Sequence, residues 1–301
     1  MCGIAGLFAR STTTRRDMGR MFTTMLEALT ERGPDSAGIA VYRDPVEPGW
    51  SKYSLCAADG SFNWTELAES IAAELTANVS LTVTGRYAIV RCADTSPGLS
   101  QWLASQTGSG SQIQIVGVGH VMEIYKDVGD PGEITKRYAI AQMTGSCMIG
   151  HTRMATESAV NLEGSHPFTA GSDLCVVHNG SYANHNTIRR ELAREGIACD
   201  SWNDTEVGAR FLQWRLAKGD DLEKALQLMM KKFSGFFTLA IGLKDQFAVV
   251  RDPYACKPLV VAETDDYVAC GSEFRALASL PGIKDATLFE PKPEGVYVWS
   301  A

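Results

Sequence analysis

The first part of the chain shows two hydrophobic patterns of different period. Residues 4–8 form a short apolar run that predicts a buried strand. Apolar side chains then recur at spacings of three and four residues, which predicts a helix with one buried face: Met18, Met21, Phe22, Met25, Leu26 and Leu29. The helical pattern stops at Gly33-Pro34, because glycine permits a left-handed helix end and proline cannot continue the helix. We therefore expect a strand, a helix and a turn, in this order.

The stretch from residue 45 to residue 145 has a different character. Prolines and a glycine open it, and small polar residues interrupt it at 107–111 and 129–132. It still contains β-rich segments at 81–90 and 113–118. One helix is predicted there by the spacing of Trp64, Leu67, Ala68, Ile71 and Leu75. We interpret residues 45–145 as an inserted subdomain, for docking a partner or covering a site, within one domain that spans residues 2–301.

The last third of the chain predicts three helices and a hairpin. Helical patterns are expected near 186–195 and at 204–217, the second with Asp204 as a plausible N-cap. A third helix is indicated by Leu222, Ala225, Leu226, Met229 and Met230, which share one face. Strands at 236–243 and 247–251, joined across residues 244–246, are typical of a hairpin. Strands and helices mixed in this way predict an α+β fold.

Composition and charge narrow the class of protein. The chain has 301 residues, 45% of them hydrophobic, and a formal net charge of −7. An acidic chain without basic clusters argues against binding to nucleic acid or to an anionic membrane. The eight cysteines show no CxxC pairs and no zinc spacing, so we expect reduced thiols and no metal site. No leader and no long apolar run are present, so we expect a cytoplasmic protein without a membrane span.

Cys2 is the most informative single residue. Removal of Met1 would make it the N-terminus, so that the thiol and a free α-amino group belong to one residue. The thiolate is the reactive form of cysteine, and an α-amino group with a pKa of about 8 is a candidate base. Taken alone, Cys2 is better explained as a small buried side chain in the first strand, because cysteine is among the residue types most often buried.

Several segments accompany Cys2-Gly3-Ile4 in order along the chain. They are Arg32-Gly33-Pro34-Asp35, Gly150-His151-Thr152-Arg153-Met154-Ala155-Thr156, Val177-His178-Asn179-Gly180 and Asp204-Thr205-Glu206, followed by Arg251-Asp252-Pro253, Lys257-Pro258-Leu259 and Ser272-Glu273. Together they resemble the class II glutamine amidotransferases, which are N-terminal nucleophile hydrolases. The resemblance covers residues 2–44 and about 146–280. It implies that family's four-layer α/β/β/α sandwich.

The resemblance also implies the roles of individual residues. Cys2 attacks the amide carbon of glutamine, and its own amino group, through a water, is the base and later the acid. The Asn179 amide and the Gly180 N–H form the oxyanion hole. Arg153 binds the α-carboxylate of glutamine and Asp204 its α-ammonium group. Arg32 and Thr156 are further substrate-binding candidates.

Simpler interpretations of these residues remain open at this point. Arg32 also fits a cation in the last turn of a helix, and Asp204 fits a helix cap. Gly180 also fits an ordinary turn glycine after asparagine. The five histidines would permit a Cys/His dyad, although His151 and His178 are interpreted as structural.

The resemblance implies a glutaminase subunit that hydrolyses glutamine to glutamate and ammonia. The chain contains no acceptor domain for the ammonia, so we expect transfer to a partner synthase subunit in a hetero-oligomeric complex. The chain looks most like the glutaminase subunit of N-methylglutamate synthase and other glutamate synthase-like systems. We expect no cofactor in this chain, and FMN or an iron–sulfur cluster in the partner. Alternatives are a different acceptor and a non-catalytic glutamine-binding regulatory subunit.

Overall fold

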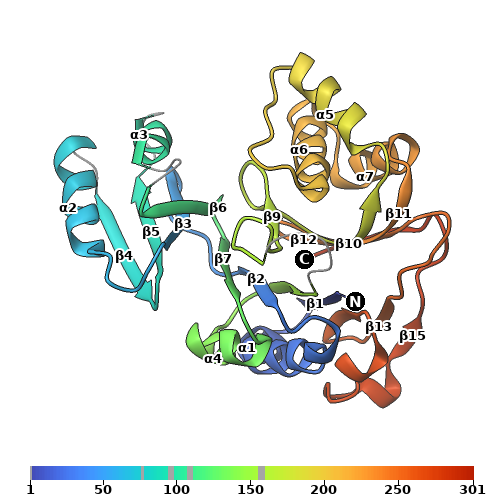
Figure 1. The fold of residues 1–301 in the computed structure, drawn as a ribbon. Coiled ribbons are helices and arrows are strands. Elements are labelled where there is room, and N and C mark those ends of the chain that lie inside the picture. Colours follow the sequence, from blue (N-terminus) through green and yellow to red (C-terminus); the bar gives the residue numbers. More distant parts are fainter. Residues whose placement is uncertain (1, 76–77, 94–97, 107–110, 155–159) are drawn as a thin grey trace.

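Two antiparallel sheets stack face to face at the centre of the molecule (Figure 1). The computed structural model describes residues 2–75, 78–93, 98–106, 111–154 and 160–301. The first sheet has seven strands in the order β15 (Thr287–Phe289), β13 (Val260–Glu263), β14 (Tyr267–Gly271), β1 (Gly3–Ala9), β8 (Cys147–Arg153), β2 (Ser36–Tyr42) and β7 (Met122–Val128). The second has five in the order β16 (Val296–Ser300), β12 (Gln246–Arg251), β11 (Gly235–Leu243), β10 (Leu174–Tyr182) and β9 (Phe168–Thr169).

Helices cover the outer faces of both sheets. The seven-stranded sheet carries α1 (Thr12–Glu27) and α4 (Pro131–Arg137), and the five-stranded sheet carries α5 (His185–Arg194), α6 (Asp204–Ala217) and α7 (Leu222–Lys232) (Figure 1). Between the sheets, the ring of Phe8 on β1 stacks on that of Phe247 on β12, with 6.2 Å between ring centroids. The arrangement is the predicted four-layer α/β/β/α sandwich. No helix in the described part of the chain is long and apolar enough to cross a bilayer.

The predicted first strand and helix are confirmed, but the helix ends earlier than expected. Every residue of β1 is buried, and the Ser11 side chain caps α1 by accepting from the Thr14 N–H. The α-helix ends at Glu27, and a short 3₁₀-helix, η1 (Thr30–Arg32), follows. Gly33 is not left-handed, since its φ is −155°. Glycine is needed there for close approach, because a Cβ would lie 2.4 Å from the Thr152 carbonyl carbon.

The second layer follows the predicted pattern with one correction. Strands β11 and β12 form the predicted hairpin, with Lys244 in the turn at φ 52°. The N-cap of α6 is Asn203, whose side chain accepts from the Thr205 N–H, so the prediction that Asp204 caps this helix was wrong. Asp204 is the first helical residue instead. Asn179-Gly180 lies inside β10 and not in a turn.

A separate four-stranded sheet stands to one side of the sandwich (Figure 1). Its strand order is β4 (Val79–Thr84), β5 (Tyr87–Ala93), β3 (Trp50–Ala57) and β6 (Ile113–Gly119), and it is accompanied by α2 (Trp64–Leu75) and α3 (Gly98–Gln106). The β-rich segment 81–90 is a hairpin that turns at Gly85, not one strand. β7 and α4 also come from the 45–145 stretch but belong to the sandwich.

Candidate active site

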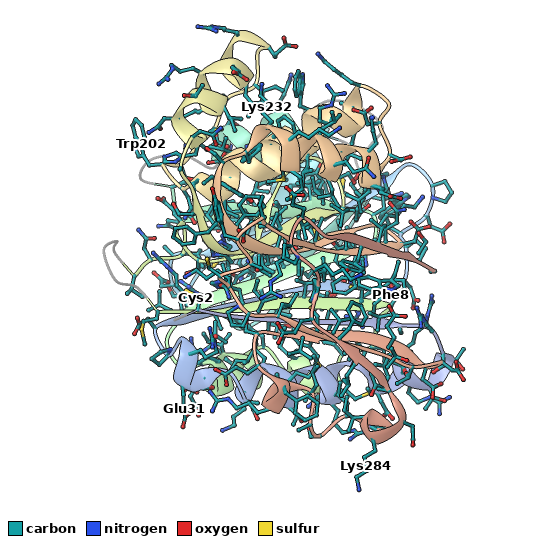
Figure 2. The ribbon with its side chains drawn as sticks, turned by 90° about the vertical axis from the view of Figure 1, so that its right-hand side faces the viewer. Cys2, Phe8, Glu31, Trp202, Lys232 and Lys284 are labelled. Carbon is teal, nitrogen blue, oxygen red and sulfur yellow. The ribbon has the colours of Figure 1, made fainter. Side chains whose placement is uncertain are left out.

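Cys2 lies directly before β1, at one end of the central strand, and Phe8 lies toward the other end (Figure 2). The thiol is partly buried, and its sulfur is 3.8 Å from the Met154 carbonyl oxygen. Burial raises the pKa of the Cys2 thiol, but interactions led by the His151 side chain outweigh burial and lower the pKa to about 7. The lowered pKa favours the thiolate, which is the reactive form of cysteine.

The backbone of Cys2 is held by two side chains that are distant in sequence. Arg32 Nε donates to the Cys2 carbonyl oxygen at 3.0 Å, and Asn179 Nδ2 donates to the same oxygen at 3.1 Å. Arg32 Nη1 also pairs with Glu273 at 2.6 Å. Two of the Arg32 nitrogens are thus engaged by the protein itself. Its observed contact is with the candidate nucleophile, which adds a positioning role to the substrate-binding role expected from sequence.

Asn179 and Gly180 reach this point from the opposite sheet. Asn179 is buried on β10, and its Oδ1 lies 2.9 Å from Nε2 of His151 on β8. Gly180 is exposed, with φ at 138°. A Cβ there would lie 2.0 Å from the Phe236 carbonyl oxygen, so no other residue fits without displacing β11. The two predicted oxyanion-hole residues are therefore placed beside Cys2 by the packing of one sheet on the other.

Arg153 and Asp204 each lie at the end of a secondary-structure element. Arg153 ends β8, and the register that pairs Gly3 with Thr152 places it next to Cys2. The residue is buried. Asp204 begins α6, is about one-fifth exposed, and accepts from the Tyr182 N–H at 2.9 Å. Arg153 is the last residue of β8 and Asp204 is the first residue of α6. Residues that contact a small substrate are expected at such positions. Thr156 lies outside the described residues.

Two residues of the site were not assigned a role from sequence. Ser272 Oγ accepts from the Ile4 N–H at 2.9 Å and from Asn179 Nδ2 at 3.3 Å. Glu273 orients Arg32 through the ion pair described above. Ser272-Glu273 was visible as a motif, but nothing in local sequence predicts a contact between residue 4 and residue 272. Only the pairing of β1 with β14 brings them together.

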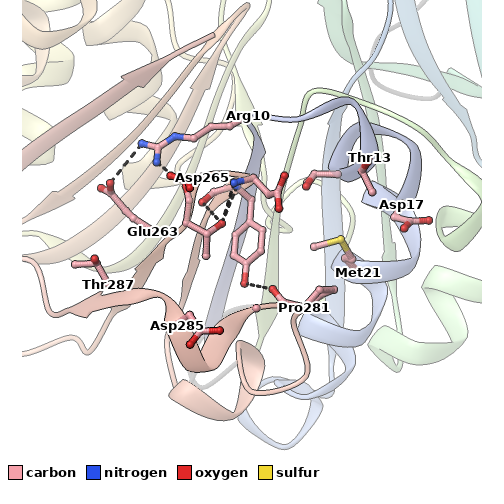
Figure 3. A pocket seen from close by; sticks show the side chains of 14 residues that line it. Arg10, Thr13, Asp17, Met21, Glu263, Asp265, Pro281, Asp285 and Thr287 are labelled. Atoms are coloured by element: carbon pink, nitrogen blue, oxygen red, sulfur yellow. Dashed lines mark hydrogen bonds and ion pairs between the residues drawn. The ribbon is translucent and has the colours of Figure 1, made fainter.

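One cavity among the described residues lies away from this site. It has a volume of about 530 Å³ and lies between the start of α1 and the β13–β14 turn (Figure 3). Its lining carries five carboxylates and one cation, Arg10, which donates to the Thr264 carbonyl at 2.8 Å. No cysteine or histidine lines it. This cavity is therefore separate from the Cys2 site.

Comparison with known proteins identifies the family. Residues 151–279 match the family described as "Glutamine amidotransferase domain". The chain is 46% identical over 299 residues to the glutamine amidotransferase-like protein GlxB of Rhizobium meliloti (strain 1021), covering 99% of this chain and 98% of that protein. The chain belongs to the class II glutamine amidotransferases. The family resemblance inferred from the motifs is thereby confirmed, and the protein is an enzyme of this class.

Longer relatives contain the same domain as one part of their length. The amidophosphoribosyltransferase of Methanocaldococcus jannaschii is 32% identical over 165 residues, which cover 54% of this chain and 35% of that protein. The solved glutamine phosphoribosylpyrophosphate amidotransferase of B. subtilis, in complex with ADP and GMP, superposes with a TM-score of 0.59 at 18% identity. It covers 99% of this chain, which spans about half (49%) of that structure. This likeness shows the fold.

Proposed function

We propose that this glutamine amidotransferase hydrolyses glutamine with Cys2 as its nucleophile. The observation that carries the proposal is the partly buried Cys2 thiol, with a pKa of about 7, beside the Asn179 amide. The thiolate attacks the carboxamide carbon, and the C–N bond then breaks as the nitrogen takes a proton and leaves as ammonia. Water hydrolyses the resulting thioester to glutamate and restores the thiol.

The remaining site residues would stabilise charges of the substrate. The Asn179 amide and the Gly180 N–H stabilise the oxyanion, and each such donor contributes about 3 kcal/mol to the transition state. In the described structure, Asn179 Nδ2 donates to the Cys2 carbonyl and to Ser272 Oγ, so oxyanion binding exchanges one of these contacts. Arg153 binds the α-carboxylate through its planar fork, and Asp204 binds the α-ammonium group. Arg32 and Thr156 complete the proposed set.

Proton transfer is assigned to the α-amino group of Cys2 after removal of Met1. This group takes the thiol proton, through a water, and returns it to the leaving nitrogen. Intact-mass spectrometry of the purified chain tests the assignment, because a quantitatively retained Met1 leaves no such amine.

The proposed fate of the ammonia is a partner synthase subunit, of the N-methylglutamate synthase or glutamate synthase-like kind, in the cytoplasm. The partner would carry FMN or an iron–sulfur cluster. The support is the resemblance of the motifs in residues 2–44 and about 146–280, together with the 45–145 stretch, which we propose as an inserted subdomain for docking or for covering the site. The alternative within this class of enzyme is a glutaminase subunit that serves a different ammonia acceptor. A non-catalytic glutamine-binding subunit is disfavoured, because the nucleophile and both oxyanion-hole residues are present together.

The deciding experiment measures glutamate release from glutamine by the purified chain and its Cys2→Ala variant. Release by the wild type and none by the variant supports the proposed chemistry. The partner is tested separately, by affinity capture of the tagged chain from its own cells. Activity that rises when the recovered subunits are added supports a synthase partner. Full activity of the isolated chain, unchanged by those subunits, would count against it.

A further inference from the structure

A second cavity lies between the four-stranded sheet and strand β7 of the sandwich (Figure 1). Its volume is about 390 Å³, and small-molecule sites typically have volumes of about 300–1,000 Å³. The sandwich contributes Arg43, which directly follows β2, and Glu123 on β7. The four-stranded sheet contributes Trp50 and Lys52 on β3 and Arg91 on β5. A ligand in this cavity would therefore contact both parts of the chain.

Strand register gathers the polar residues of the cavity on one face of the four-stranded sheet. Lys52 stands opposite Arg91, and Arg91 stands opposite Ser80 on β4. Directly opposed side chains share a face, and Trp50 joins them because residues two apart on a strand also do. The other face of this sheet is apolar and packs with α2 and α3. The row of Lys52, Arg91 and Ser80 therefore faces the cavity and β7.

Three cations converge on one buried carboxylate at the floor of the cavity. Glu123 is 1% exposed, and its Oε1 lies 3.2 Å from Lys52 Nζ and 3.2 Å from Arg91 Nη2. Its Oε2 lies 3.5 Å from Arg43 Nη1. One carboxylate neutralises one cation, so two positive charges remain beside the cavity.

Lys52 is the cation that the protein itself satisfies. Its side chain is buried, and Nζ donates to the Asp44 carbonyl at 3.0 Å, to the Val121 carbonyl at 3.4 Å and to Glu123 at 3.2 Å. An ammonium group has three hydrogens, so none remains for a ligand. Burial lowers the pKa of Lys52, and the two neighbouring guanidinium groups act in the same direction against the opposing effect of Glu123.

The two arginines carry the surplus charge. Their side chains are partly exposed, 35% for Arg43 and 25% for Arg91. Among the described residues, Nη1 alone of the Arg43 nitrogens has a protein acceptor. Arg91 uses Nη1 for Thr82 Oγ1 at 2.9 Å and Nη2 for Glu123, which leaves Nε without an acceptor in the same part of the chain. Both guanidinium groups therefore have donors left for an anion.

The remainder of the lining is acidic at the rim and apolar beside it. Asp44 and Glu47 are exposed, and neither forms an ion pair in the part of the chain that the structure describes. The partly buried Trp50 lines the cavity together with Pro45 and Val46. The cavity thus offers an indole ring and apolar side chains next to the two arginines.

From this charge balance we propose that the cavity binds a phosphate monoester that carries a flat or apolar group. Such a phosphate has a charge of about −1.5 to −2 at neutral pH, which matches two arginines better than the single charge of a carboxylate does. The guanidinium forks bind the phosphate oxygens, and Trp50 contacts the flat group. The ligand bridges Arg43 of the sandwich to Arg91 of the four-stranded sheet. The site is separate from Cys2 and does not depend on glutamine hydrolysis.

Calorimetric titration of the full chain with three probes tests the proposal. Phenyl phosphate has both the dianion and the ring, inorganic phosphate lacks the ring, and benzoate lacks the second charge. Phenyl phosphate should bind most tightly. Raising the salt concentration should weaken its binding, because dissolved ions screen partly exposed charges.

Substitutions place the binding in this cavity. Arg43→Gln and Arg91→Gln should each weaken phenyl phosphate binding about ten-fold, through loss of a charge-assisted hydrogen bond. Trp50→Leu should weaken the binding of phenyl phosphate but not that of inorganic phosphate. Arg215→Gln is the matched control, since Arg215 lies on α6 and its side chain is 24% exposed. It should bind all three probes like the wild type.

The outcomes that overturn the proposal are distinct. They are no saturable binding of phenyl phosphate to the wild type, and unchanged binding in the arginine variants. Benzoate that binds as tightly as phenyl phosphate would overturn the choice of a phosphate. Thermal melting shows which variants are folded, and Arg43→Gln decides the test if Arg91→Gln is not, because Arg43 has only the 3.5 Å contact with Glu123 to lose. Glutamate release enters none of these measurements, so failure of the proposed function would leave them unaffected.

Discussion

The two ends of strand β1 differ in how they use polar side chains. At the Cys2 end, Arg32 and Asn179 converge on one backbone oxygen, and every one of these groups is at least partly buried. At the Arg10 end, carboxylates line an open cavity, and Arg10 pairs with Glu263 at 3.4 Å (Figure 3). The Cys2 end therefore combines convergent buried donors with a thiol of lowered pKa, whereas the Arg10 end has a cavity without such a group.

The largest loss of activity is expected from a substitution of Cys2 itself. Cys2→Ala should abolish glutamate release, because the attacking sulfur is gone, while the fold remains intact. Glutamate release and a thermal melt on the same preparation measure both. A variant that stays folded and retains turnover would move the chemistry away from this end of β1.

Asn179→Ala should have the next largest effect. Loss of one oxyanion donor should lower kcat by about 100-fold to 1000-fold. Asp285→Asn, in the cavity at the other end, is the control and should leave kcat unchanged. Equal losses in the two variants would indicate general destabilisation instead of a specific donor.

The pH dependence of alkylation and turnover should follow the Cys2 thiol. Its pKa is lowered to about 7, and the thiolate is the reactive form. The rate should therefore fall about ten-fold for each pH unit below that value and level off above it. Iodoacetamide alkylation measured in parallel with glutamate release checks this. A profile that still rises steeply above pH 8 would show an ordinary thiol.

Arg153→Lys should chiefly weaken glutamine binding. A lysine supplies the charge but not the two-pronged contact with a carboxylate, so KM should rise about ten-fold with a smaller change in kcat. Steady-state kinetics separates the two constants. An unchanged KM would give Arg153 a structural role.

The smallest effect is expected at the other end of β1. The Tyr267 hydroxyl, which faces the large cavity, donates to the Pro281 carbonyl at 2.8 Å. Tyr267→Phe should cost about 1 kcal/mol of folding free energy, the contribution of a typical hydrogen bond, without changing turnover. Denaturant unfolding and glutamate release give the two values. A loss of turnover in Tyr267→Phe would show that the two ends of β1 are coupled.

Local pattern predicted the elements that carry the site but not the contacts within it. The spacing of apolar residues alone located β1, α1 and the β11–β12 hairpin. It misplaced the end of α1, where the close approach of Gly33 to Thr152 decides the geometry, and the cap of α6, where Asn203 and not Asp204 accepts from the Thr205 N–H. The candidate residues Cys2, Asn179 and Gly180 came from the family resemblance of the motifs, not from hydrophobic period.

The other contacts required the folded chain. Arg32 on the Cys2 carbonyl, Ser272 on Ile4 and His151 on Asn179 join residues between 28 and 268 positions apart. Such contacts arise from sheet order and the stacking of two sheets, which no local pattern encodes. His151 was interpreted from sequence as structural, and its neighbourhood with the thiol emerged only from the register of β1 and β8.

The central claim is that Cys2 is the nucleophile. The most direct test is the site of covalent labelling by the glutamine analogue diazo-oxo-norleucine, located by peptide mass spectrometry. The account predicts a single label on Cys2, blocked by glutamine. Cys256 is the internal competitor, because it is exposed and free, whereas Cys147 is buried. Labelling of Cys256 or another thiol in place of Cys2 would contradict the account.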